Sequence, residues 1–264
     1  MTTSVAFEKA RAEGRAALVG YLPAGYPSVD GSITALRAMV QAGVDVVEVG
    51  LPYSDPLIDG PVIQRAVDGA LRAGTTTTDV LRVVEAVAAT GAPAVVMSYW
   101  NPLGRYGAAA FARDLAAAGG SGVITPDLTP DADDAWLPAA REHGLDTVFL
   151  VAPSSTDERI AMTTASCRGF VYATSVMGVT GTRDQVSDAA SVLVSRTRAT
   201  TELPVAVGLG VSDAGQAAEI AAFADGVVVG SAFVRRMLEA PDEPAGAASV
   251  AELAGELAGG VRRR

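Results

Sequence analysis

Residues 44–52 read VDVVEVGLP, a run of valines that ends in glycine and proline. The run is almost continuously apolar rather than alternating, which is typical of a parallel strand covered on both faces. Short apolar runs of this kind recur along the chain, each followed by an alanine-rich stretch that suits a crossover helix. There are eight of them, at 16–25, 44–52, 93–100, 122–127, 147–153, 169–175, 204–210 and 226–232. Eight βα units predict an α/β protein folded as a (β/α)8 TIM barrel.

A doubly wound sheet is the alternative, because it shows the same alternation of strands and helices. A dinucleotide-binding fingerprint would favour it. The nearest match, GLGVSDAG at 208–215, has Asp213 where the third glycine should stand and follows the seventh run instead of the first. The barrel is therefore the predicted fold, with an extra N-terminal helix around residues 4–13 closing its bottom. We expect residues 1–264 to form a single domain.

Local signals predict where some helices begin and end. Ser28 is expected to open one helix, and Thr78 with Asp79 another, since these residue types cap helix N-termini. His143, the only histidine, precedes a glycine and is expected at a helix C-terminus rather than as a base. Cys167, the only cysteine, excludes an internal disulfide and a thiolate metal cluster, and is expected to be a small buried filler.

The composition excludes several classes of function. Hydrophobic residues make up 49% and charged residues 19%, which suits a large buried core. Lys and Arg number 20 against 30 Asp and Glu, and the basic residues are scattered apart from the terminal VRRR, so no nucleic-acid partner is expected. No uninterrupted run of 18 apolar residues occurs, so we expect no membrane association and a cytoplasmic location.

Glu48 stands inside the 44–52 run, where burial of an unpaired carboxylate is costly. It has the parity of Gly50 and lies near the end of the predicted strand, so it is expected to point into the barrel mouth, where this fold places its active sites. Either Glu48 forms a buried ion pair, or it is a general acid–base whose pKa burial raises. In the following loop, Asp59 is either catalytic or a solvated acid, and Asp55 is expected to serve a turn.

Glycines at the ends of the seventh and eighth runs suit an anion site. Gly210, Gly230 and Ser231 are predicted to form a phosphate cradle from backbone N–H groups, with tight turns as the alternative. The glycine- and threonine-bearing loop SVMGVTGTRD, at 175–184, is expected to act as a lid. These features predict an enzyme that acts on a phosphorylated metabolite by carboxylate chemistry, with no metal and no redox cofactor.

Five segments together resemble the tryptophan synthase α subunit family along nearly the whole chain. They are GYLPAGYPS (20–28), VEVGLPYSDPLIDGPVIQ (47–64), GVTG (178–181), VGLG (207–210) and VVGSA (228–232), in the family's order. Tyr53 stands where that family usually has phenylalanine. The resemblance implies a carbon–carbon lyase of tryptophan biosynthesis, which cleaves indole-3-glycerol phosphate to indole and glyceraldehyde 3-phosphate by a reverse aldol reaction.

The resemblance also implies roles for individual residues. Glu48 would deliver a proton to indole C3 and help to remove the proton of a glycerol hydroxyl, and Asp59 would bind the indole N–H. Tyr172 would lie beside the substrate, although core packing is its alternative, and Tyr21 and Ile63 would flank the indole ring. Thr180 would meet Asp59 when the lid closes. Phosphate contacts would come from Gly181, Leu209, Gly210, Gly230 and Ser231.

The family implies a partner as well. Its members form an αββα heterotetramer in which indole passes to a β subunit that carries pyridoxal phosphate, so no cofactor is expected in this chain. The loop around Asp127 would face the partner, or would simply be a strand-end turn. Val176 stands where an arginine is common in the family's lid, so a contact made by that arginine is not expected here. A non-catalytic regulatory subunit and a stand-alone lyase that releases indole are the alternative functions.

Overall fold

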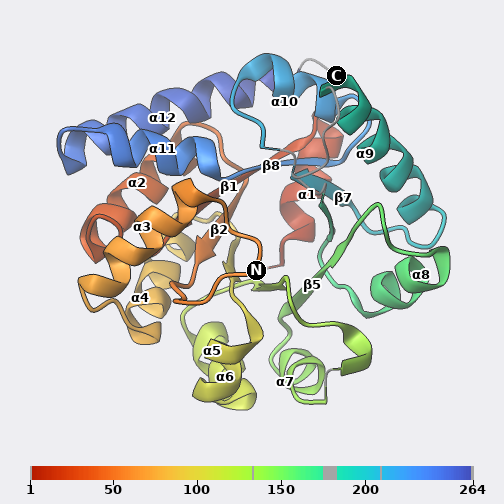
Figure 1. Cartoon of the computed structure of the whole chain (residues 1–264), viewed down its shortest axis with the longest axis horizontal. Helices are drawn as coiled ribbons and strands as arrows, with labels where there is room; N and C mark the ends of the chain where they lie inside the picture. The colour runs from red at the N-terminus through yellow and green to blue at the C-terminus, as the bar shows by residue number, and fades with distance from the viewer. Residues whose placement is uncertain (1, 133, 175–182, 209, 263–264) are drawn as a thin grey trace.

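Eight parallel strands close into a barrel in chain order (Figure 1). The computed structural model describes residues 2–132, 134–174, 183–208 and 210–262. Its strands are β1 (Ala17–Pro23), β2 (Val46–Gly50), β3 (Ala94–Met97), β4 (Gly122–Thr125), β5 (Asp146–Val151), β6 (Val171–Thr174), β7 (Val205–Gly208) and β8 (Gly226–Val229). Each predicted run overlaps one strand, and β8 pairs with β1 to complete the ring. The predicted (β/α)8 barrel is confirmed, and the doubly wound alternative was wrong.

Helices surround the barrel (Figure 1). Ser28 caps α2 by accepting a hydrogen bond from the Gly31 N–H, as predicted. The predicted cap of α4 was wrong: the N-cap is Thr76, because the Asp79 carboxylate reaches back to the Thr76 N–H in a capping box. The outer helices are α2 (Val29–Gln41), α3 (Pro61–Arg72), α4 (Thr77–Ala88), α5 (Trp100–Tyr106), α6 (Ala108–Ala117), α7 (Trp136–Glu142), α8 (Asp157–Ser166), α9 (Arg183–Arg198), α10 (Ala214–Ala221), α11 (Ser231–Glu239) and α12 (Glu243–Gly260).

The extra N-terminal helix, α1 (Ser4–Ala12), closes the bottom of the barrel as predicted. Its Phe7 is buried and lies 5.1 Å, centroid to centroid, from the ring of Phe170 on the inner wall. The backbone N–H and the hydroxyl of Thr3 both donate to the Asp146 carboxylate, at 2.7 Å each. These contacts fasten α1 to the start of β5.

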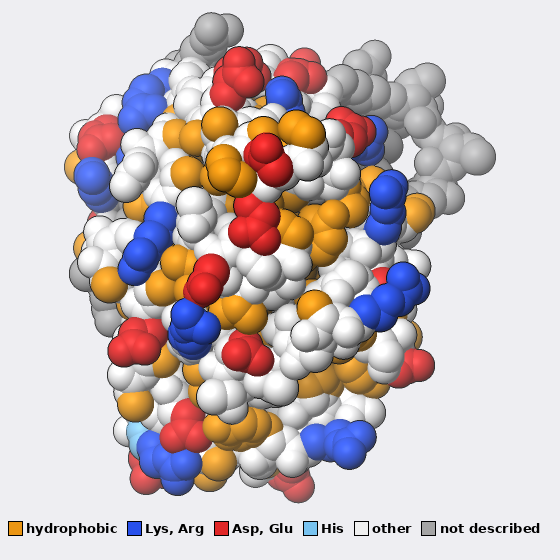
Figure 2. All heavy atoms as spheres, turned by 90° about the vertical axis from the view of Figure 1, so that its left-hand side faces the viewer, with side chains coloured by type: hydrophobic (Ala, Val, Ile, Leu, Met, Phe, Trp, Pro, Cys, Tyr) orange, Lys and Arg blue, Asp and Glu red, His pale blue; other side chains and the backbone are white. Residues whose placement is uncertain are grey.

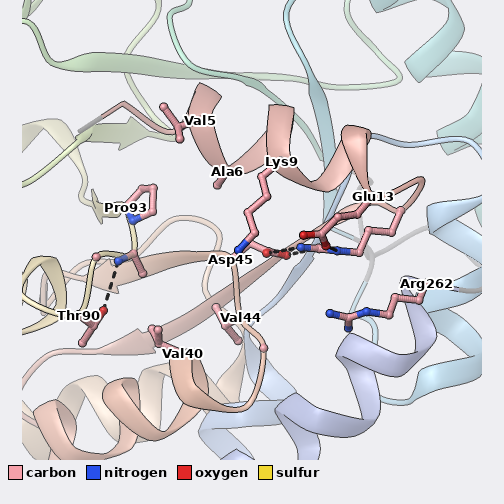
Figure 3. A pocket seen from close by; sticks show the side chains of 14 residues that line it. Val5, Ala6, Lys9, Glu13, Val40, Val44, Asp45, Thr90, Pro93 and Arg262 are labelled. Atoms are coloured by element: carbon pink, nitrogen blue, oxygen red, sulfur yellow. Dashed lines mark hydrogen bonds and ion pairs between the residues drawn. The ribbon is translucent and has the colours of Figure 1, made fainter.

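A cavity of about 350 Å³ also lies at this bottom end, between α1 and the turns that precede β2 and β3 (Figure 3). An ion cluster lines this cavity. In it, the guanidinium of the buried Arg15 donates to Asp45 at 2.6 and 2.7 Å and to Glu13 at 2.7 Å. The Asp45 carboxylate also accepts the Leu18 N–H at 2.9 Å. Asp45 directly precedes β2, so its bonds with Arg15 and with Leu18 of β1 join the first strand to the start of the second.

Alternate residues of the strands point inward, and the lower part of the barrel is filled by apolar side chains. The inward set includes Ala17, Val19, Val46, Val95, Ile124, Val148, Phe170, Ala206 and Val228, packed with Ala6, Phe7 and Ala10 of α1. Outward-facing strand residues pack under the helices. An inward polar side chain above these apolar residues therefore faces the mouth of the barrel.

The two His and Cys predictions are confirmed by the fold. His143 is the C-cap residue of α7, and Cys167 is a buried free thiol.

Figure 2 shows acidic and basic side chains interspersed on the face that carries α2, α3 and α4. Within the described residues, no helix is both long and apolar enough to cross a bilayer.

Candidate active site at the barrel mouth

Glu48 is the only acid carried by β2, and it lies one inward position above Val46. Its side chain is 3% exposed, and its Oε2 atom has no hydrogen-bond partner among the described residues. No described residue forms an ion pair with it, so the buried ion pair weighed from the sequence is not present there. Burial, and secondly the charge of Asp59, raise the pKa of Glu48 to about 8. Glu48 can therefore hold a proton near neutral pH and release it there.

Asp59 lies in the loop between β2 and α3, half-buried above the mouth. Its own carbonyl accepts a hydrogen bond from Gln64 Nε2 at 2.7 Å, which ties the loop to the first turn of α3. Burial raises the pKa of the Asp59 carboxyl, and a hydrogen bond with Tyr99 opposes that rise. Asp55, by contrast, is exposed and accepts from the neighbouring Ser54 hydroxyl at 2.5 Å, as expected of a turn residue.

Tyr99 is a site residue that the sequence did not reveal. It follows β3, is 2% exposed, and its hydroxyl accepts the Ile58 N–H at 3.1 Å. Burial raises the pKa of Tyr99 to about 12, so it stays a neutral phenol beneath the Asp59 loop. Tyr53 of the same loop packs on its ring at 5.4 Å. The sequence did contain one signal for it: Tyr99 is an even number of residues from the inward-facing Val95, so its side chain is expected on the same face.

Two more tyrosines enter the mouth from β1 and β6. Tyr21 lies opposite Glu48 in the strand register, and Tyr172 lies in register with Ala206. Each phenol extends over a glycine of the next strand: a Cβ on Gly50 would meet the Tyr21 hydroxyl, and one on Gly208 would meet that of Tyr172. Burial raises the pKa of both phenols well above the usual value, with the charges of Asp59 and Glu48 adding to the rise for Tyr21 and that of Glu48 for Tyr172. The glycines thus make room for two rings beside Glu48.

Apolar side chains complete the floor. Met97 of β3 and Leu150 of β5 are partly accessible, and both pack with the inward apolar set. Neither was identified from the sequence, although both share the inward parity of their strands. Ile63, predicted to flank the ring, lies on α3 and packs partly buried against the outer core. The floor suits a flat apolar ring.

The predicted phosphate cradle lies at the ends of β7 and β8. Gly210 has φ +67°, a backbone conformation that favours glycine. Gly230 is the N-cap of α11 without a side-chain cap, and Ser231 is the first residue of that helix. The first N–H groups of a helix have no acceptor within that helix, so those of α11 can bind an anion.

Several predicted residues lie outside the described residues. They are Thr180, Gly181 and Leu209, together with Val176. Asp127 lies inside them: its carboxylate accepts the Trp100 N–H at 2.9 and 3.1 Å, which caps α5. Among the described residues, no group of three or more His, Cys, Asp or Glu is arranged to hold a metal.

A sequence profile of the family Tryptophan synthase alpha chain matches residues 7–262. The chain belongs to that family. It is 64% identical over 258 residues to the tryptophan synthase alpha chain of Salinispora tropica, covering 98% of this chain and 97% of the relative. The alpha chain of Thermobifida fusca is 62% identical over 257 residues, with 96% and 95% covered.

Solved structures agree with this membership of the tryptophan synthase alpha chain family. Mycobacterium tuberculosis tryptophan synthase superposes with a TM-score of 0.91 at 55% identity, over 98% of each chain. The alpha subunit from Legionella pneumophila gives 0.89 at 30% identity, over 99% of this chain and 98% of that one. The protein is thus a carbon–carbon lyase of tryptophan biosynthesis that cleaves indole-3-glycerol phosphate.

The raised pKa of Glu48 predicts a pH-dependent stability. The unfolded value is 4.5 and the folded value about 8. Between pH 4.5 and about 8, Glu48 is ionised in the unfolded chain and still protonated in the folded chain. The contribution of Glu48 to the free energy of unfolding is therefore fully present below pH 4.5 and is lost as the pH rises through about 8. Each pKa unit is worth about 1.4 kcal/mol. Glu48→Gln should match the wild type in unfolding free energy near pH 5 and exceed it by a few kcal/mol near pH 9.

Urea unfolding at the two pH values measures this difference. Glu85→Gln, a change of the same charge at an exposed position on α4, should show no such trend. A constant gap between Glu48→Gln and wild type across the range would contradict burial of an ionisable Glu48.

Proposed function

We propose that Glu48 and Asp59 carry out the cleavage of indole-3-glycerol phosphate. The observation that carries the proposal is a buried Glu48 with its pKa raised to about 8, lying below a half-buried Asp59 at the mouth of the barrel. A carboxyl that is protonated near neutral pH can act first as an acid and then as a base. A carboxylate held by a loop can stabilise a positive charge that develops on the ring.

The proton returns to its starting point in this mechanism. Glu48 gives its proton to indole C3, and the ring nitrogen becomes cationic beside the Asp59 carboxylate. The Glu48 carboxylate then removes the proton of the hydroxyl on the chain carbon bonded to C3. The bond from that carbon to C3 breaks, its electron pair restores the neutral indole, and the chain carbon becomes the aldehyde of glyceraldehyde 3-phosphate. No oxidant or reductant is required.

The phosphate of the substrate would be held by Gly210, Gly230 and Ser231, with Gly181 and Leu209 as further contacts. The α11 N-terminus supports this, because it offers N–H groups and a favourable dipole to an anion at the mouth. Tyr21, Tyr172 and Ile63 would border the indole ring, and Thr180 would approach Asp59. Roles at Thr180, Gly181 and Leu209 rest on the family resemblance.

Ser231→Asp tests the phosphate site. A carboxylate at the first position of α11 should repel the phosphate and raise KM for indole-3-glycerol phosphate about a hundredfold, since juxtaposed like charges cost several kcal/mol. An acid in the first turn favours the helix, so folding should be retained. Ser231→Ala is the matched control and should change KM little, because the N–H groups remain. Equal weakening of free indole and of the phosphorylated substrate by Ser231→Asp would remove the assignment.

We also propose that the chain is one domain that works in the cytoplasm with a β subunit, in an αββα heterotetramer. The loop beside Asp59 supports a docking surface at the mouth, because it exposes two apolar residues, Leu57 at 74% and Ile58 at 56%. Pyridoxal phosphate would belong to that partner. Lys9, the only lysine of this chain, lies in α1 at the opposite end of the barrel.

Indole release from indole-3-glycerol phosphate by the purified chain, with and without a β subunit, tests the whole assignment. Cleavage that is slow alone and faster with the partner is expected. Fast release without any response to the partner would favour the stand-alone lyase. Absence of cleavage under both conditions, with the partner still activated, would favour a regulatory subunit.

A further inference from the structure

The hydroxyl of Tyr21 occupies a space that the fold leaves open for it. Tyr21 lies opposite Glu48 in the β1–β2 register, and its ring passes over Gly50, where a Cβ would meet the phenol. On its other side, a Cβ on Gly230 would touch the ring at 3.4 Å. The ring is therefore held between β2 and β8 with its hydroxyl beside the mouth.

The Tyr21 hydroxyl has no protein partner within the described residues. The residue is 6% exposed, but its hydroxyl is not among the fully buried polar atoms that lack a partner, so it is accessible at the mouth. The charges of Asp59 and Glu48 both act on it. A hydroxyl that faces an open site without a protein partner can hydrogen-bond a bound molecule.

The chemistry of the substrate indicates which group that is. Indole-3-glycerol phosphate has four polar sites: the ring N–H, two chain hydroxyls and the phosphate. In the proposed function, Asp59 takes the N–H, Glu48 takes the hydroxyl next to the ring, and the β7 and β8 ends take the phosphate. The second chain hydroxyl is left. The Tyr21 hydroxyl lies over Gly50, where the charges of both carboxylates act on it, and the base of its ring lies beside Gly230.

We infer that Tyr21 hydrogen-bonds the second hydroxyl of the glycerol chain, and so selects indoles that carry a polyol phosphate. This inference rests on the proposed function. Tyr21 would then determine substrate specificity through its hydroxyl, in addition to lying beside the indole ring.

Tyr21→Phe tests the inference, because it removes one oxygen and keeps the ring. The probes are indole-3-glycerol phosphate and indole-3-propanol phosphate, which lacks both chain hydroxyls. Loss of one hydrogen bond should lower kcat/KM for the first about tenfold. The Kd of the second should stay within about twofold, since it has no hydroxyl to lose. Tyr26→Phe, on the outer side of the barrel beside Gly69, is the matched control and should change neither value.

Each other result would overturn the inference. Equal weakening of both probes would mean that Tyr21 acts through packing alone. Unchanged values for both would mean that its hydroxyl makes no contact with the substrate. Failure of the proposed function is a separate result, because it would appear as missing cleavage by the wild-type chain, or as full cleavage by Glu48→Gln, whatever Tyr21→Phe does.

Discussion

Glu48→Gln should lower kcat for indole-3-glycerol phosphate cleavage by about 10²- to 10⁴-fold, the range for a lost general acid–base. Glutamine nearly fills the space of the glutamic acid in the buried site above Val46, but it can neither give a proton to C3 nor remove one from the chain hydroxyl. Single-turnover cleavage, followed by the appearance of indole, measures the loss directly.

Binding separates this effect from misfolding. The variant should bind indole-3-propanol phosphate as the wild type does, because none of the proposed phosphate contacts is changed. It should also still stimulate a β subunit, because the exposed Leu57 and Ile58 of the proposed docking surface are unchanged. Glu85→Gln serves as the control for cleavage too. A Glu48→Gln variant that cleaves at the wild-type rate would sink the acid–base assignment.

Asp59→Asn should lower kcat/KM by about 10²- to 10³-fold, the typical loss when one preorganised electrostatic group is removed. Asparagine can still accept a hydrogen bond from the ring N–H, but it cannot stabilise a positive charge on the ring. The loss should therefore appear in the cleavage step more than in the affinity for indole. Cleavage assays and equilibrium binding of indole measure the two effects separately.

Asp55→Asn is the matched control, since it makes the same change in the same loop at an exposed turn position. It should leave cleavage within a small factor of the wild type. If Asp55→Asn and Asp59→Asn reduced cleavage equally, the effect would come from loop conformation, and Asp59 would lose its special role.

Features that depend on neighbours along the chain were predictable. The valine-rich runs identified every strand, because strands buried on both faces need apolar residues at each position. Strand parity was enough to place Glu48 in the mouth, because successive side chains alternate between the two faces. The prediction of Thr78 as an N-cap was wrong for a local reason, because the segment TTTT contains several threonines that could cap the helix. Thr76 is the cap because the Asp79 side chain can hydrogen-bond the residue three positions before it.

Features that depend on distant strands were not predictable from a single sequence. Strand parity with Val95 could place Tyr99 in the mouth, but not its contact with the loop after β2. That contact forms because the loop folds over the end of β3, and nothing near Tyr99 in the chain encodes it. The fit of Tyr21 over Gly50 likewise joins two strands through their register. In the sequence Gly50 marks only the end of an apolar run, whereas in the barrel its missing side chain makes room for a phenol.

The pairing of β8 with β1 has a consequence for biosynthesis of the chain. Ala17 pairs with Gly226, and the Ala16 N–H donates to the Val261 carbonyl at 3.3 Å, so the first strand is completed by the strand that is made last of the eight and by the C-cap residue of α12. A ribosome-bound chain that still lacks β8 leaves two sheet edges unpaired, at β1 and at β7. Contacts so distant in sequence form slowly, and unpaired edges invite aggregation. Premature termination before residue 226 should therefore yield insoluble fragments rather than a partly active enzyme.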